Sequence, residues 1–170
     1  MTMAEIFALA IAGLACITDL RSARIPNALT FSALALGLLF HVLAPSGSGL
    51  LAAFAGLLAG LLVFFPFFAL GAMGAGDVKL MAALGVWLGW QPVIQVALYG
   101  AVAGGVLAIV LAMWRGYLRT ALQNILALFR YWAVVGIKPL PELTLEAGTG
   151  LRLPYALPIM VGLVVTLWRL

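Results

Sequence analysis

Residues 77–90, which read Asp-Val-Lys-Leu-Met-Ala-Ala-Leu-Gly-Val-Trp-Leu-Gly-Trp, decide how many times this chain crosses a membrane. The run is apolar after its first residues, but as a helix it would be only about 21 Å long at about 1.5 Å per residue. The hydrocarbon core of a bilayer is about 30 Å thick. If this run crosses the bilayer and reaches the far interface, its first residue, Asp77, must lie below the near surface.

The composition identifies the chain as an integral membrane protein. Of its 170 residues, 66% are hydrophobic and 8% are charged, and the mean hydropathy is +1.22. Soluble domains are about half apolar and about a quarter charged. The net charge of +4 is spread over short loops, so it does not indicate a nucleic-acid-binding surface. The single cysteine, Cys16, can form neither an internal disulfide nor a cysteine-based zinc site.

Five further apolar segments accompany the short one, and they occupy residues 3–20, 28–44, 50–72, 92–114 and 153–170. A helix that spans the bilayer needs about 20 apolar residues, so we expect an all-α polytopic membrane protein with about six transmembrane helices. Basic residues follow the first segment, which fits a membrane anchor better than a cleaved leader. Three pairs of glycines predict close helix packing: Gly56 and Gly60, Gly85 and Gly89, and Gly100 and Gly104.

The basic residues predict the orientation of the chain. With six spans, eight of the nine lysines and arginines fall on one side of the membrane, and only Arg169 falls on the other. The positive-inside rule then places the basic loops in the cytoplasm and both chain ends outside. Without the short span, the charges would scatter over both faces.

Residues 115–152 form the only long loop of the predicted topology. Within it Leu118, Leu122, Ile125, Leu126 and Phe129 recur at helical spacing, which predicts an amphipathic helix in the cytoplasmic interface. We therefore expect one transmembrane domain over residues 1–170, with a core at 1–114, this loop at 115–152 and a last span at 153–170.

Acidic residues are scarce, and two of the five lie at the ends of apolar segments. Asp19 and Asp77 both fall on the predicted cytoplasmic side, whereas Glu5, Glu142 and Glu146 lie in water-facing ends or loops. An ionisable group in a membrane segment is costly and marks a functional site by default. We therefore expect Asp19 and Asp77 to act as a pair.

Each aspartate lies in a distinctive stretch. Residues 19–30 read Asp-Leu-Arg-Ser-Ala-Arg-Ile-Pro-Asn-Ala-Leu-Thr, and residues 74–85 read Gly-Ala-Gly-Asp-Val-Lys-Leu-Met-Ala-Ala-Leu-Gly. Pro26 suits the turn that starts a helix, and Asn27 can bond free amides of that helix. Gly74 and Gly76 allow a bend and the close approach of another segment. Lys79 is foremost a charge that fixes topology.

These two stretches resemble the type IV prepilin peptidases, which are intramembrane aspartic proteases with a Gly-x-Gly-Asp (GxGD) motif. The resemblance covers about residues 6–114 and implies that Asp19 and Asp77 are the catalytic dyad of a hydrolase. It implies cleavage of the leader of a type IV prepilin or pseudopilin at the cytoplasmic face of the bacterial inner membrane, after a glycine. No metal or other cofactor is expected.

The chain departs from the long members of that family. They carry a cytoplasmic insertion with paired cysteines that is linked to N-methylation, which is not expected here. The compact form looks like the peptidases of tight-adherence (Flp) pilus systems. Residues 154–158 read Pro-Tyr-Ala-Leu-Pro, where related compact enzymes usually have Pro-Tyr-Gly.

Two nearby carboxylates cannot both ionise cheaply, so one should hold a proton while the other activates a water molecule. The sequence does not decide which aspartate takes which role, nor whether the chain forms a homo-oligomer. A docking hypothesis lays the apolar segment of the substrate along the helix that carries Asp77.

Two functions of other classes stay open. A small ion-coupled transporter would use buried aspartates near the middle of the membrane, and a secretion machine could use the chain as a non-catalytic scaffold. Neither accounts for both motifs together.

Overall fold

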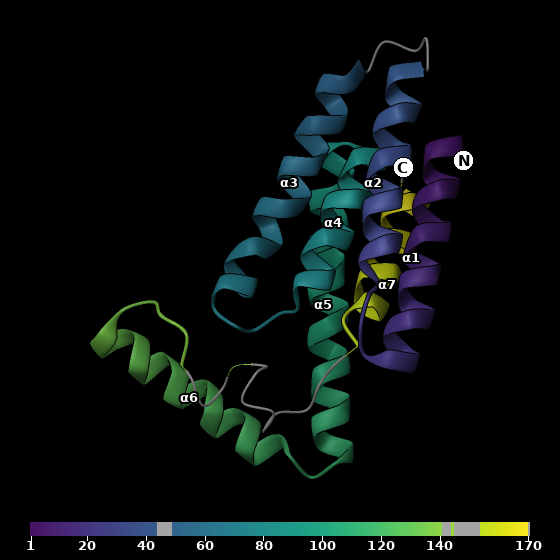
Figure 1. Cartoon of the computed structure of the whole chain (residues 1–170). Coiled ribbons are helices and arrows are strands. Elements are labelled where there is room, and N and C mark those ends of the chain that lie inside the picture. The colour runs from purple at the N-terminus through teal and green to yellow at the C-terminus, as the bar shows by residue number, and fades with distance from the viewer. Residues whose placement is uncertain (44–48, 141–143, 145–153, 170) are drawn as a thin grey trace.

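The computed structural model describes residues 1–43, 49–140, 144 and 154–169 of the chain. All regular secondary structure within these ranges is helical, which confirms the predicted all-α polytopic membrane protein. Figure 1 shows the seven described helices. They are α1 (Met3–Ser22), α2 (Asn27–Leu43), α3 (Gly49–Ala69), α4 (Ala75–Leu88), α5 (Trp90–Trp114), α6 (Leu118–Val135) and α7 (Ala156–Arg169).

The helices differ in how far they can reach across a bilayer. Three of them, α1, α3 and α5, are long and apolar enough to cross it, with 20, 21 and 25 residues. Two others, α2 and α7, are shorter apolar helices. The decisive segment, predicted at 78–90, is helix α4 of 14 residues. It ends before Gly89, whose φ of +85° lies in the left-handed region that favours glycine.

Several predicted boundaries are wrong by two or three residues, for local reasons. Helix α3 ends at Ala69 rather than at residue 72, because the amides of Gly71 and Ala72 turn back to the carbonyls of Phe68 and Phe67. This pattern, with Gly71 at a φ of +73°, is a Schellman motif. Helix α5 begins two residues before Pro92, which is tolerated in a first turn because amides there have no helical partner.

Helix α4 lies at the centre of the bundle, where it packs against α1, α2, α3 and α5. Val78 and all residues from 80 to 87 are buried. The indole N–H of Trp87 donates to the carbonyl of Ala33 at 3.0 Å and so ties α4 to α2. The helix that carries Asp77 is therefore covered by protein along most of its length.

Glycines set the closest helix contacts. A Cβ atom on Gly56 of α3 would overlap the carbonyl of Gly85 on α4, and one on Gly85 would overlap the carbonyl of Gly56. Gly60 faces Met81 in the same way, and Gly100 faces the start of α7. The predicted packing role is therefore confirmed for these glycines and for Gly104, which contacts Tyr155. Gly89 shares the first contact, since a Cβ atom on Gly56 would lie 2.9 Å from Cα of Gly89, and Gly89 also ends α4.

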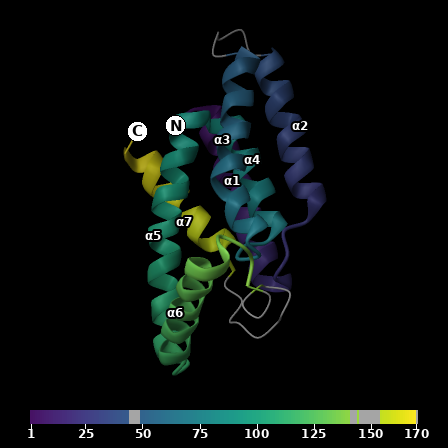
Figure 2. The same cartoon turned by 90° about the vertical axis from the view of Figure 1, so that its left-hand side faces the viewer.

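The connections alternate between the two ends of the bundle, as Figures 1 and 2 show. The α1–α2 and α3–α4 connections, the end of α5 and the start of α7 lie at one end, and α6 lies beside it. The start of α1, the end of α7 and the α4–α5 turn lie at the other end. Of the eight basic residues predicted to share one side, seven belong to elements at the first end: Arg21, Arg24, Lys79, Arg115, Arg119, Arg130 and Lys138. Arg152 lies outside the described residues.

Helix α6 is the amphipathic helix predicted within residues 115–152. None of its residues is buried, and its apolar side chains Leu118, Leu122, Ile125, Leu126 and Phe129 are exposed. It contacts α5 and points away from the bundle. Its location in the membrane interface stays a prediction.

Candidate active site

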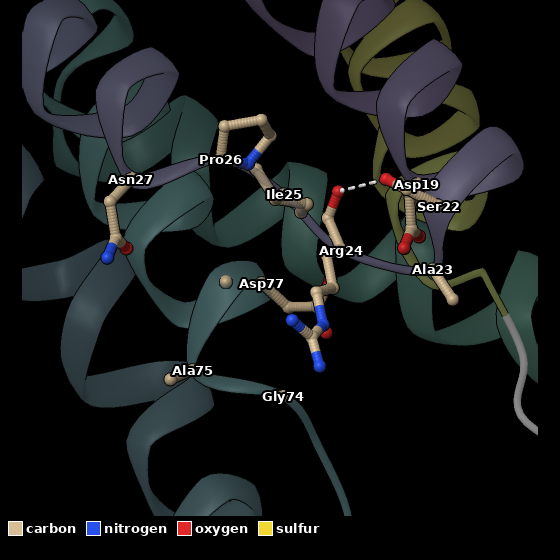
Figure 3. A pocket seen from close by; sticks show the side chains of 11 residues that line it. Asp19, Ser22, Ala23, Arg24, Ile25, Pro26, Asn27, Gly74, Ala75 and Asp77 are labelled. Carbon is tan, nitrogen blue, oxygen red and sulfur yellow. Dashed lines mark hydrogen bonds between the residues drawn. The ribbon is translucent and has the colours of Figure 1, made fainter.

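Asp19 and Asp77 line one cavity of about 520 Å³, although 58 positions separate them in the sequence. The wall of the cavity is formed by two stretches, residues 19 and 22–27 from the end of α1 and the connection to α2, and residues 74–77 from the start of α4. Figure 3 shows these side chains around the opening. Gly74, Gly76, Pro26 and Asn27, which the motifs singled out, all belong to this wall.

The turn after α1 carries the chain across the cavity. Ala23 ends α1 in the left-handed conformation, with a φ of +50°, and its amide donates to the carbonyl of Asp19 at 2.8 Å. The hydroxyl of Ser22 donates to the carbonyl of Thr18 at 2.7 Å and to that of Arg24 at 3.4 Å, the bond drawn in Figure 3. These bonds fix the connection that forms one wall of the site.

The carboxylate of Asp19 is bound by the backbone of the last helix. The amide of Ala156, the first residue of α7, donates to Oδ2 of Asp19 at 3.1 Å. A backbone amide carries no residue-type signal, so the motifs could not reveal this partner. The only hint was the Pro-Tyr-Ala stretch of residues 154–156, at the start of the predicted last span.

Asp77 is the third residue of α4, and its amide donates to the carbonyl of Gly74 at 3.2 Å. This position confirms that Asp77 opens a helix, where the dipole favours a carboxylate. Gly74 has a φ of −76°, which any residue adopts, so the bend before Asp77 does not require a glycine at this position. The glycine matters for space, because a Cβ atom there would lie 3.3 Å from Oδ2 of Asp77.

Gly76 fulfils the other predicted role, close approach. A Cβ atom on Gly76 would lie 3.1 Å from Cβ of Ile25, which is tighter than most real Cβ contacts. The α1–α2 connection can therefore lie directly on the first turn of α4. The two walls of the cavity meet at this contact.

Lys79 lies outside the wall of the cavity but supports it. Its ammonium group donates to Oδ1 of Asn27 at 2.9 Å and lies 5.3 Å from the centre of the Phe31 ring. Asn27 was expected to bond free amides of α2, but its side chain binds Lys79 instead. Pro26 starts α2 as predicted, since its carbonyl accepts the amides of Leu29 and Thr30.

Tyr155 precedes α7 on the side of Asp77. Its half-buried ring packs edge-on against Phe64, with 5.7 Å between ring centres. The Asp77 carboxylate lies near the Tyr155 phenol. Across the described part of the chain, no group of three or more His, Cys, Asp or Glu residues could hold a metal ion.

Comparison with known proteins places this site in a family. The sequence profile described as "Type IV leader peptidase family" matches residues 6–109, a range that contains both aspartates and all the wall residues. The chain belongs to the type IV leader peptidase family. Ala156, which binds Asp19, lies beyond the matched range.

The two relatives compared below have the same name. The chain is similar to the "Prepilin leader peptidase/N-methyltransferase" of Pectobacterium carotovorum, with 36% identity over 126 residues, 71% of this chain and 44% of that protein. The protein of the same name from Burkholderia pseudomallei is 39% identical over 108 residues, 59% of this chain and 34% of that protein. The chain thus spans less than half the length of these relatives. No solved structure matches it.

Proposed function

We propose that this protein is an intramembrane aspartic endopeptidase that removes the leader peptides of type IV prepilins or pseudopilins. The observation that carries the proposal is the cavity between α1 and α4, into which the two motifs bring Asp19 and Asp77. The family and the names of the relatives agree with this chemistry. Within this class of substrates we propose Flp-type pilins.

The reaction uses the two carboxyl groups in different protonation states. The ionised carboxylate takes a proton from a water molecule, and the water oxygen attacks the scissile carbonyl carbon. The protonated carboxyl stabilises the developing oxyanion and then supplies the proton that the leaving amine takes when the C–N bond breaks. Two acids in one cavity should titrate as a coupled pair, as in other aspartic proteases.

The substrate reaches the dyad at the first turn of α4. The hypothesis that the apolar segment of the substrate lies along the helix carrying Asp77 stays a prediction, and it applies best to the first turn of α4, because Val78 and residues 80–87 are buried. The exposed Ala75 and the half-buried Gly74 and Gly76 leave only the start of α4 accessible. The basic leader remains in the cytoplasm, and cleavage follows a glycine that precedes the apolar pilin segment.

The proposal also specifies where the protein lies in the cell and whether it methylates its product. The protein resides in the bacterial inner membrane with its cavity at the cytoplasmic face and both chain ends outside, as the charges of its connections favour. Transfer of a methyl group to the new pilin terminus is not part of the proposed activity. This part of the proposal follows from the single cysteine of the chain, since the resemblance links methyl transfer to paired cysteines.

A cleavage assay in membranes tests the proposal. A tagged candidate prepilin is co-expressed with the wild type, with Asp19→Asn or with Asp77→Asn, and the mass of the pilin is followed. Asparagine keeps the shape of the side chain and removes the ionisable acid, so we expect each variant to lose more than about a hundredfold in rate. The control is Glu5→Gln, since Glu5 caps α1 at the opposite end of that helix and should be dispensable.

The outcomes separate clearly. Shortening of the pilin by the wild type and by Glu5→Gln, but by neither aspartate variant, establishes the dyad. If both aspartate variants insert normally and still shorten the pilin, Asp19 and Asp77 are not the catalytic groups.

A further inference from the structure

The corner between α5 and α6 sets the direction in which α6 leaves the bundle. Gly116 has a φ of +65°, and its amide donates to the carbonyl of Met113 at 3.1 Å. The amide of Tyr117 donates to the carbonyl of Ala112 at 2.8 Å, which completes a Schellman motif. The side-chain amide of Asn124, on α6, donates to the hydroxyl of Tyr117 at 3.2 Å. These bonds tie α6 to the corner, so that it runs sideways from the end of α5 instead of continuing its direction (Figure 1).

The corner lies close to the surface of the bilayer, and α6 is exposed there. Helix α5 is long and apolar enough to cross the membrane, and only residues 115–117 separate it from α6. Trp114, the last residue of α5, is 85% exposed. On α6, Leu122 and Phe129 are 59% and 62% exposed, although both are apolar. A large apolar face without a protein cover, directly after a membrane-spanning helix, requires a partner.

The charge of this region has one sign. Residues 115–138 contain no aspartate or glutamate. They contain four basic residues, Arg115, Arg119, Arg130 and Lys138. The side chains of Arg119 and Arg130 are exposed, and within the described part of the chain neither has a hydrogen-bond or ion-pair partner. Both guanidinium groups are therefore available to an anion from outside the chain.

The two arginines lie along one edge of the apolar face. They are about three helical turns apart, so Arg119 and Arg130 project from the same side of α6. Leu122 and Leu126 lie between them on that side, at spacings of three or four residues. A long basic side chain at such an edge can lay its stem along apolar surface while its charged end reaches the lipid headgroups.

We propose that α6 is a binding surface for anionic phospholipids. Its apolar side chains enter the acyl region, and Arg119 and Arg130 bind the phosphate groups, whose oxygens match the planar guanidinium. An apolar face alone would hold α6 in the interface of any bilayer, whereas the basic edge selects negatively charged headgroups. A second copy of the chain fits this face poorly, because it would bring the same positive charges to the contact.

Lipid quenching in nanodiscs tests the proposal without any catalysis. The full chain with Ile125→Cys in a Cys16→Ala background carries a bimane fluorophore on the apolar face of α6. The nanodiscs contain equal amounts of phosphatidylcholine and phosphatidylglycerol, and the acyl chains of only one of the two lipids carry a nitroxide quencher. We expect quenching by the labelled phosphatidylglycerol to be about twofold stronger, because each basic residue near an anionic surface adds about fivefold in affinity.

Matched variants separate charge from shape and one face from the other. Arg119→Gln with Arg130→Gln should abolish the preference, whereas Arg119→Lys with Arg130→Lys should keep it, because lysine retains the charge. Arg21→Gln removes a charge at the same end of the bundle but outside α6, so the preference should persist. Thr120→Cys places the fluorophore on the opposite face of α6, where both lipids should quench it weakly.

Every outcome decides the proposal. Equal quenching of the Ile125→Cys label by the two lipids overturns the selectivity for anionic headgroups. If neither lipid quenches that label, a protein surface, such as a second copy, covers this face and the proposal fails. A preference that survives the glutamine pair would show that Arg119 and Arg130 do not select the lipid. None of these results depends on cleavage of a prepilin, so the proposed function is tested separately.

Discussion

At the residue scale, the absence of a side chain at Gly76 keeps the two walls of the cavity together. A methyl group on Gly76 would meet Cβ of Ile25 at 3.1 Å, and neither atom belongs to a flexible side-chain end. In Gly76→Ala the connection after α1 must shift, and with it the geometry of Asp19 relative to Asp77. We expect cleavage to fall by about tenfold to a hundredfold, since small misplacements of reacting groups cost that much.

The matched control for this prediction is Gly105→Ala. A Cβ atom on Gly105 of α5 meets nothing within 4 Å, and its φ is ordinary for a helix. This variant should cleave at the rate of the wild type in the same membrane assay. Equal rates for Gly76→Ala and Gly105→Ala would show that the close contact with Ile25 is not needed.

The sequence predicted which side chains form the site, but it could not predict which backbone groups bind them. Asp19 and Asp77 stood out because carboxylates are rare in this chain and costly in membrane segments. The spacing role of Gly76 followed from its missing side chain. The amide of Ala156 could not be predicted, since every residue except proline carries one. The partner of Asn27 was missed because Lys79 reaches it only after α2 and α4 have packed together.

At the scale of elements, the contact between α3 and α4 depends on glycines of both helices. In Gly85→Val the new side chain would overlap the backbone carbonyl of Gly56, which cannot move aside as a flexible side chain can. Forced insertion of extra atoms into a packed core costs about 1–3 kcal/mol or more. We expect the purified variant in detergent to unfold several degrees below the wild type in a thermal scan.

Gly13→Ala serves as the comparison for that scan. Gly13 also lies inside a helix, but a Cβ atom on it meets nothing within 4 Å. It should unfold at or slightly above the temperature of the wild type, since alanine favours helix over glycine. If Gly85→Val unfolds at the same temperature as Gly13→Ala, α3 and α4 do not pack as described.

Elements were predictable in number and kind, and less so in their ends and surroundings. All six apolar segments form helices because apolar residues continue through each of them. Their ends moved where glycines turn the backbone, as at Gly71 and Gly89. The central position of α4 had no signature in its composition, because lipid tails and neighbouring helices are equally apolar environments.

At the scale of the whole molecule, the alternation of the connections predicts which residues share a side of the membrane. Single cysteines are introduced at Thr2 and Thr120 in a Cys16→Ala background, since both threonines are exposed and lie in elements at opposite ends. In intact cells, a maleimide that cannot cross the membrane should label Thr2→Cys and not Thr120→Cys. Opening the cells should allow both to react.

The reverse labelling pattern would place the cavity on the outer face. The count of basic residues predicted which connections lie together, and the structure groups the described ones in the same way. The count of basic residues succeeded because orientation depends on a charge difference summed over many loops. An error of a few residues at one helix end does not change that sum.

The enclosure of α4 has a consequence for inhibition. Since α1, α2, α3 and α5 surround this helix, a compound dissolved in the hydrocarbon phase has no direct path to Asp77. A blocking molecule must arrive from water, through the opening between the α1–α2 connection and the start of α4, where the guanidinium of Arg24 stands (Figure 3). Lipophilic compounds that partition into the membrane would accumulate at the lipid-facing surface of the helices, away from the opening of the cavity. Compact, water-soluble molecules that present an anionic group to Arg24 are the better starting chemistry for a drug against this protein.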